Sequence, residues 1–187
     1  MKLQHLGLLK QNTEDWPLEK DWITETPVSI PLFPDVKVPF MVDHSDYGGI
    51  YNQKQTDNAI QNLFEYSESL KKEIEQTTYT QWIDFNNAVG YLETLKVYKS
   101  ANDAPKWMTS AIKQMEPLIH LTSQEKIWEH IFLYEVVITK DRYLNDKDIY
   151  VKLLMNCRWA EEHGLQIILK NGNKLVRVSE IDGNLFD

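Results

Sequence analysis

The sequence predicts an α+β fold with N-terminal β-strands, two to three central helices and a C-terminal antiparallel β-meander, packed in two layers. Three observations predict it. Prolines punctuate short apolar runs up to residue 43, a helical period governs the chain from residue 57, and a period of two follows residue 122. With 187 residues, 42% of them hydrophobic, the chain is expected to form one domain, 1–187, around a single core.

The N-terminal part of the chain is predicted to form short edge strands. Prolines end each apolar run between Lys2 and Asp43, and proline cannot donate a backbone hydrogen bond inside a sheet. The runs WITETPVSI and VKVPFMV flank PLFPD at 31–35, which predicts a hairpin with its turn there. The segment HSDYGGIYNQ at 44–53 is predicted to be a loop that leads to the helices.

Amphipathic helices are predicted in the middle of the chain. Apolar side chains recur at steps of three and four over 57–74, with charged residues on the opposite face. Thr78 and Gln81 have the spacing of a capping box, which predicts that a second helix begins there and carries apolar residues as far as Leu95. Asp103 before a proline predicts a third, shorter helix.

The last third of the chain is predicted to be an antiparallel sheet. Residues 127–141 are apolar on both faces, which predicts a central strand that includes His130. Residues 149–159 alternate between apolar and polar side chains and predict a second strand. Asn171 and Gly172 separate the runs LQIILK and KLVRVS, and Asn-Gly between such runs is the strongest short-range hairpin signal. These two residues are therefore predicted to form a structural turn.

Composition limits the classes of function. Twenty-eight acidic residues against twenty basic ones give a net charge of −8 at pH 7. Neither nucleic acid nor a membrane is expected as a partner, because both carry negative charge, whereas a basic protein would be attracted. The single cysteine allows no intrachain disulfide. The N-terminus does not resemble a signal peptide and no apolar window approaches bilayer length, so a cytoplasmic location is expected.

The stretch WAEEHG at 159–164 gathers residues that could carry chemistry. Glu161, Glu162 and His163 could form a metal site or an acid/base site. Adjacent residues of a strand point to opposite faces, however, so only a tight turn could direct all three toward one ion. The favoured interpretation is a polar turn in which Gly164 takes a left-handed conformation. No cofactor and no bound metal are expected.

Other candidate residues have plain structural interpretations. Cys157 and Trp159 share the apolar face of their predicted strand, which favours core packing over a nucleophilic role for the thiol. The acidic and amide residues of 141–148 lack the glycine of a calcium-binding EF-hand loop. Trp16 and Trp22, in the charged stretch EDWPLEKDW, could form a protein-binding rim or a sugar platform, or could pack the N-terminal arm onto the domain.

The run LLMNCRWAEEHGLQIILKNGNKLVRVSEIDG at 153–183 resembles the C-terminal signature of an uncharacterised bacterial family, a domain of unknown function. The signature C-x-W-x-x-E-H-G-L is matched by Cys157, Trp159, Glu162, His163, Gly164 and Leu165. Ala160 stands where the family pattern has Asp, which argues against metal binding at that position. The resemblance implies a small acidic protein of the kind encoded in toxin and immunity gene clusters.

Three hypotheses of function follow. The preferred one is a non-enzymatic, protein-binding immunity protein that neutralises a basic toxin domain, because the chain is acidic and has no complete catalytic motif. Its expected binding residues are Trp159, Glu161, Glu162, His163, Trp16 and Trp22. The second hypothesis is a metal-dependent or hydrolytic enzyme that uses Glu161, Glu162 and His163. The third is a small-ligand or glycan binder that uses the tryptophans.

Overall fold

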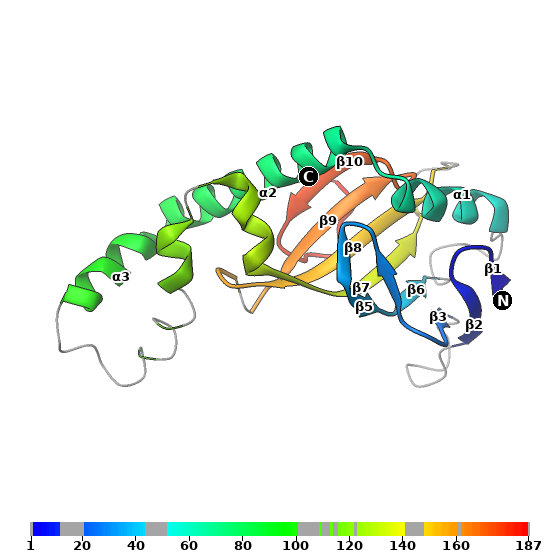
Figure 1. The fold of residues 1–187 in the computed structure, drawn as a ribbon, viewed down its shortest axis with the longest axis horizontal. Helices are drawn as coiled ribbons and strands as arrows, with labels where there is room; N and C mark the ends of the chain where they lie inside the picture. The colour runs from blue at the N-terminus through cyan, green and yellow to red at the C-terminus, as the bar shows by residue number, and fades with distance from the viewer. Residues whose placement is uncertain are drawn as a thin grey trace.

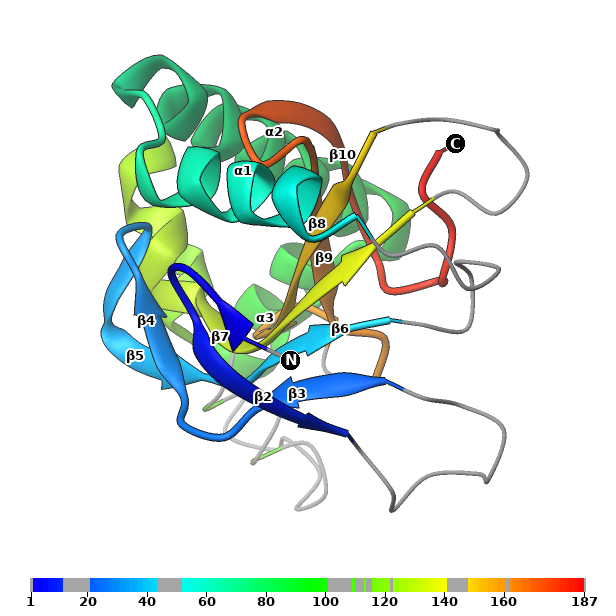
Figure 2. The same ribbon diagram turned by 90° about the vertical axis from the view of Figure 1, so that its right-hand side faces the viewer.

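The computed structural model describes residues 2–11, 21–43, 52–100, 109, 113, 116–121, 123–140, 148–160 and 162–186. The predicted α+β class is confirmed: helices α1 and α2 pack on one face of a mixed β-sheet (Figure 1, Figure 2). The elements are β1 Lys2–Leu3, β2 Gly7–Gln11, β3 Trp22–Thr24, β4 Val28–Ile30, β5 Phe33–Val38, β6 Phe40–Val42, α1 Gln53–Phe64, α2 Glu68–Val89, α3 Tyr91–Ser100, the 3-10 helices η2 Glu116–His120 and η3 Gln124–His130, β7 Ile131–Thr139, β8 Tyr150–Cys157, β9 Leu165–Lys170 and β10 Lys174–Ser179.

The main sheet joins the two ends of the chain. Its strand order is β1-β2-β3-β6-β7-β8-β9-β10, and β7 to β10 form the predicted antiparallel meander. The N-terminal strands extend the same sheet, because β6 lies beside β7 with Phe40 opposite Val136. This pair is parallel, and a parallel pair needs a long crossover connection, which the helical region provides. In the sequence, the central helices therefore separate the two segments that form the sheet.

The predicted N-terminal hairpin is present, but its turn is shorter than predicted. Ile30 pairs with Phe33, so Pro31 and Leu32 alone form the turn between β4 and β5. Phe33 is buried, and its ring meets the ring of Trp128 edge-on with centroids 5.2 Å apart. This aromatic contact packs the start of β5 against η3.

The boundary between the first two helices was predicted at the wrong residue. It lies before Ser67, whose hydroxyl accepts a hydrogen bond of 3.2 Å from the backbone N–H of Leu70 and so caps α2. Thr78 lies inside α2 and is buried. It shares the core-facing side of the helix with Ile74 and Trp82. The apparent capping box is a buried helical position.

Helix α2 also ends earlier than predicted. Gly90 takes a left-handed conformation with φ of 61°, its N–H donates to the carbonyl of Asn86, and α3 begins at the next residue. The prediction of one helix carrying Leu95 is therefore wrong. Helix α3 projects beyond the sheet, as Figure 1 shows. The third helix, predicted to begin at Asp103 and to stop before Pro117, lies in a segment of which only 109, 113 and 116 are described.

The strand predicted over 127–141 begins later than expected. Residues up to His130 form the 3-10 helix η3, and β7 starts at Ile131. The indole N–H of Trp128 donates to a carboxylate oxygen of Glu75 on α2 over 2.6 Å, which ties η3 to the helix. His130 is buried at the end of η3, and burial, followed by the charge of Arg158, lowers its pKa.

The two ends of β7 have different surroundings. From Val136 onward the strand is buried on both faces, as predicted. Phe132 and Tyr134 are exposed near its start, where a bulge interrupts pairing with β8.

Within the described residues, no helix is long and apolar enough to cross a bilayer.

Candidate functional site

The signature turn, residues 158–164, connects β8 to β9. The Gly164 N–H donates to the Ala160 carbonyl over 2.8 Å, which closes the turn. Trp159 is only 3% exposed, and its indole N–H donates to the side-chain oxygen of Gln81 on α2 over 2.8 Å. Its ring also packs against Trp82 with centroids 5.8 Å apart. Trp159 thus anchors the beginning of the turn to the long helix.

Gly164 fixes the other end of the signature turn. Its φ of 66° lies in the left-handed region. A Cβ atom at this position would lie 2.8 Å from Cδ1 of Ile181 and 2.9 Å from the carbonyl oxygen of Met155. The backbone of the turn therefore passes close to two neighbouring segments, and only glycine avoids both contacts. The Ile181 N–H donates to the His163 carbonyl, which extends the pairing of β9 and β10 to the turn.

The predicted binding residues fall into different environments. Glu162 and His163 are exposed at the centre of the signature turn. Trp159 is buried, and Trp22 is half-buried against the core. Trp16 and Glu161 lie outside the described residues. Glu162 and His163 are neighbours in the sequence and both are exposed, whereas Trp22 is half-buried and the Trp159 ring is buried. A binding role for each of these residues stays a prediction.

The Asn-Gly turn between β9 and β10 is held against α1. Asn171 and Gly172 have φ of 50° and 75°. The Asn171 side chain accepts from the Ile149 N–H and donates to Asp148, at 2.9 and 2.7 Å. A Cβ atom on Gly172 would lie 1.9 Å from the carbonyl oxygen of Ala59 in α1. Asn171 and Gly172 are therefore held between α1 and the residues at the start of β8.

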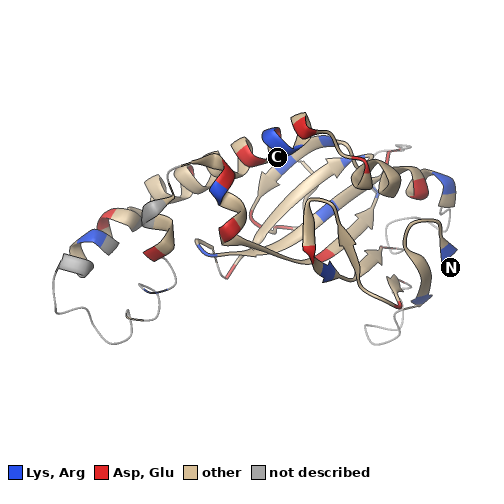
Figure 3. Cartoon of the chain, in the orientation of Figure 1, with Lys and Arg blue, Asp and Glu red and all other residues tan. Residues whose placement is uncertain are grey.

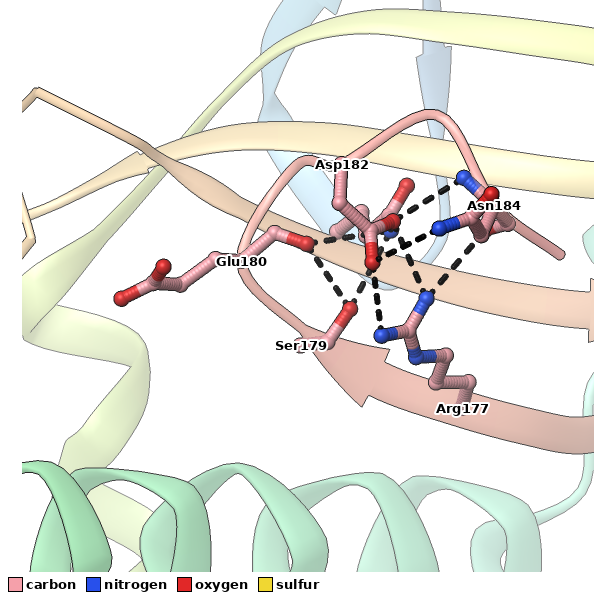
Figure 4. A network of polar contacts seen from close by, with 6 residues as sticks. Arg177, Ser179, Glu180, Asp182 and Asn184 are labelled. Atoms are coloured by element: carbon pink, nitrogen blue, oxygen red, sulfur yellow. Dashed lines mark hydrogen bonds and ion pairs between the residues drawn. The ribbon is translucent and has the colours of Figure 1, made fainter. Parts of the chain in front are cut away.

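The chain after β10 folds back over the sheet through a polar network (Figure 4). Arg177 donates to both carboxylate oxygens of Asp182, at 3.0 and 2.8 Å. The buried Gln166 of β9 donates to the same carboxylate over 2.8 Å. Burial alone would raise the pKa of Asp182, but hydrogen bonds from Arg177, the Asn184 N–H and Gln166, with the Arg177 charge, lower it to about 2.

An open groove of about 410 Å³ lies between α2 and β10. Helix α2 contributes the side chains of Gln81, Asp84 and Phe85, and the β10 side contributes Val178 and Glu180. Gln81 is also the residue that holds Trp159, so the groove adjoins the anchor of the signature turn. The groove combines two carboxylates with apolar walls.

Acidic residues are spread over α1, α2, the 3-10 helices and the β4–β5 hairpin (Figure 3). Among the described residues, which leave out Glu161, no three His, Cys, Asp or Glu side chains are grouped so that they could hold a metal ion. Cys157 is buried, with its sulfur 3.8 Å from the carbonyl oxygen of Ala160.

Sequence reasoning missed the groove and the Arg177–Asp182 network. Asp84 and Glu180 are almost one hundred positions apart in the chain, and no local period relates them. Arg177 interrupts the apolar run KLVRVS five residues before Asp182. That spacing was the available signal for an ion pair that closes the C-terminal segment onto the last strand.

Comparison with known proteins gives one result for the family. No curated protein and no solved structure matches the chain. A family model described as "Domain of unknown function (DUF6985)" matches residues 8–186, which is nearly the whole chain. The expected resemblance to a family of unknown function is confirmed at this level, and the chain belongs to the DUF6985 family.

Proposed function

We propose that this protein is a non-enzymatic binding module of immunity type, which neutralises a basic toxin domain by forming a complex with it. The net charge of −8 supports the proposal, because a negative surface attracts a positive partner over several ångströms and accelerates association. The same charge opposes binding to nucleic acid or to an anionic membrane.

One observation carries the proposal: Glu162 and His163 are exposed at the centre of a turn whose two ends are fixed. Trp159 holds one end through Gln81, and Gly164 packs against Ile181 at the other. A surface whose backbone is already ordered loses little conformational entropy when a partner docks. The described residues of the signature turn, 158–160 and 162–164, therefore suit a preorganised contact surface.

The direct test is co-expression with the product of the neighbouring gene, followed by purification of the complex and calorimetry at low and high salt. We expect a complex whose dissociation constant rises by about tenfold or more with added salt, because screening weakens attraction between opposite charges. We also expect protection from growth arrest by the neighbouring product. If the neighbouring product neither binds at low salt nor is neutralised, the proposal is wrong.

A matched pair of charge reversals locates the effect. Glu162→Lys should weaken the complex by about tenfold, because it places a cation on the proposed contact surface. Asp35→Lys changes the net charge by the same amount on the β4–β5 hairpin, where Asp35 is exposed. This control should leave the dissociation rate unchanged. Equal weakening by both variants would show that only the overall charge matters.

A further inference from the structure

We infer that the groove between α2 and β10 is the site that receives one arginine or lysine side chain of the basic partner. The cation would lie between the carboxylates of Asp84 and Glu180, and the methylene stem would lie along Phe85 and Val178. This inference rests on the proposed function and names the surface and the chemistry through which it would act.

The two carboxylates are available to a ligand. Asp84 is exposed and Glu180 is half-exposed. In the network of Figure 4 it is the backbone carbonyl of Glu180 that accepts hydrogen bonds, from Gln166 and Ser179, and the carboxylate points away from the network. Within the described ranges, no hydrogen bond or ion pair to either carboxylate is present. In this part of the chain, neither carboxylate is paired with a cationic side chain.

The walls of the groove suit a long cationic side chain. Arginine and lysine bury their methylene groups on apolar surface while the charged head stays with polar groups. Phe85 and Val178 supply such surface, and both are half-buried. The Phe85 ring can also attract a cation through its face. A guanidinium has five N–H donors in one plane and can therefore satisfy two carboxylates, so arginine is the preferred occupant.

The groove is connected to the signature turn through Gln81. This residue lines the groove and accepts the hydrogen bond from the Trp159 indole. A side chain that enters the groove would therefore change the environment of the Trp159 indole N–H, even though that ring is buried. This gives the inference a spectroscopic signature at a defined atom.

The test uses the peptide acetyl-Gly-Gly-Arg-Gly-Gly-amide, with a citrulline peptide of the same length as the neutral control. Titration into the full ¹⁵N-labelled chain should give saturable shifts at the amides of Thr80, Asp84 and Glu180 and at the Trp159 indole. The citrulline peptide should give none. The double variant Asp84→Asn/Glu180→Gln should lower the affinity by about tenfold or more.

A matched control removes the same charge elsewhere. Asp35→Asn/Glu25→Gln alters two exposed carboxylates, one on β5 and one between β3 and β4, so the peptide should bind this variant as it binds the unmodified chain. Shifts scattered over the acidic surface, no saturable shift at the groove, or equal losses in both double variants would overturn the inference.

The neighbouring gene product separates this inference from the proposed function. If that product binds the unmodified chain and the Asp84→Asn/Glu180→Gln variant equally well, the groove is not its contact and the inference is wrong, while the proposed function stands. If the product does not bind but the arginine peptide saturates the groove, the proposed function is wrong and the groove remains a cation site. If the Asp84→Asn/Glu180→Gln variant binds neither the gene product nor the arginine peptide, while the control variant binds both, the inference and the proposed function are both supported.

Discussion

The two turns at the ends of β9 differ in what surrounds them. The Asn-Gly turn after β9 lies against the backbone of α1, and both polar groups of the Asn171 side chain are hydrogen-bonded. The signature turn before β9 is held by Trp159, by Gly164 and by the backbone of His163, and it leaves the side chains of Glu162 and His163 exposed. The Asn171 and Gly172 positions of the first turn serve the fold, whereas the second turn presents two adjacent ionisable side chains, Glu162 and His163, to solvent.

This difference teaches that a strong turn signal does not report how the turn is used. Both turns carry a glycine with positive φ, at Gly164 and at Gly172. The contacts that distinguish them come from distant segments, since Ala59 closes on one turn and Ile181 on the other. If the comparison is right, substitutions should have graded effects on stability that follow these contacts.

Gly172→Ala should have the largest effect. Its Cβ would lie 1.9 Å from the Ala59 carbonyl oxygen, so α1 or the whole hairpin must move. We expect the free energy of unfolding to fall by about 3 to 5 kcal/mol, the range typical of severe backbone strain and disrupted packing. Urea unfolding monitored by tryptophan fluorescence measures it.

Gly7→Ala is the control for the conformational part of this loss. Gly7 has φ of 77°, close to that of Gly172, but nothing lies within 4 Å of its Cβ position. It should cost only about 1 kcal/mol, which is the left-handed penalty without a clash. Similar losses for the two variants would mean that the close packing of the Asn-Gly turn on α1 contributes nothing.

Gly164→Ala should have an intermediate effect. One close contact of its Cβ is a side-chain atom of Ile181, which can move, and the other is the fixed carbonyl of Met155. We expect a loss of about 2 kcal/mol in the free energy of unfolding. The double variant Gly164→Ala/Ile181→Ala should recover part of the loss attributed to Gly164→Ala in a double-mutant cycle. No coupling between the two sites would contradict the proposed contact.

Local patterns predicted the fold class and the Asn-Gly hairpin, because periodicity and turn chemistry are properties of short segments. They failed where a distant contact decided the outcome. Trp128 donates a hydrogen bond to Glu75 of α2 from within η3, and the strand begins only at Ile131. The helix begins after Ser67, although Thr78 and Gln81 have the spacing of a capping box. Such contacts join segments that no local window contains.

The candidate site illustrates the same limit. Glu162, His163 and Gly164 stood out in the sequence because they are adjacent. The groove, which reaches the Trp159 anchor through Gln81, is lined by Asp84 of α2 and by Glu180 after β10, and this depends on how the helix crosses the sheet. Residue types alone could not have predicted that arrangement.

The Asp182 carboxylate should make stability depend on pH in the acidic range. Its pKa in the folded chain, about 2, lies below the ordinary value of 3.8. The unfolded chain therefore takes up this proton first as the pH falls. The contribution to stability is complete above about pH 4 and is lost as the pH falls toward 2.

Comparison with Asp182→Asn measures this contribution. The two chains should differ most in free energy of unfolding near neutral pH, and the difference should shrink through the acidic range. We expect a small effect, because the Asp182 side chain is 35% exposed and water screens its charge. A pH-independent difference would show that Asp182 acts through geometry alone.

The smallest effect on stability is expected from Glu162→Ala and His163→Ala. Both side chains are exposed at the centre of the signature turn, and surface substitutions away from special contacts change stability by about 0.5 kcal/mol or less. Complex formation with the neighbouring gene product should nevertheless weaken, because these side chains would lie at the contact surface.

Thermal unfolding with and without added Zn²⁺ provides the opposing test. A zinc-dependent rise in melting temperature that both variants abolish would favour the enzymatic hypothesis, since a ligand stabilises only the state that binds it. The signature turn would then be a metal site, and it would differ from the Asn-Gly turn by binding an ion and not by presenting side chains to a protein partner.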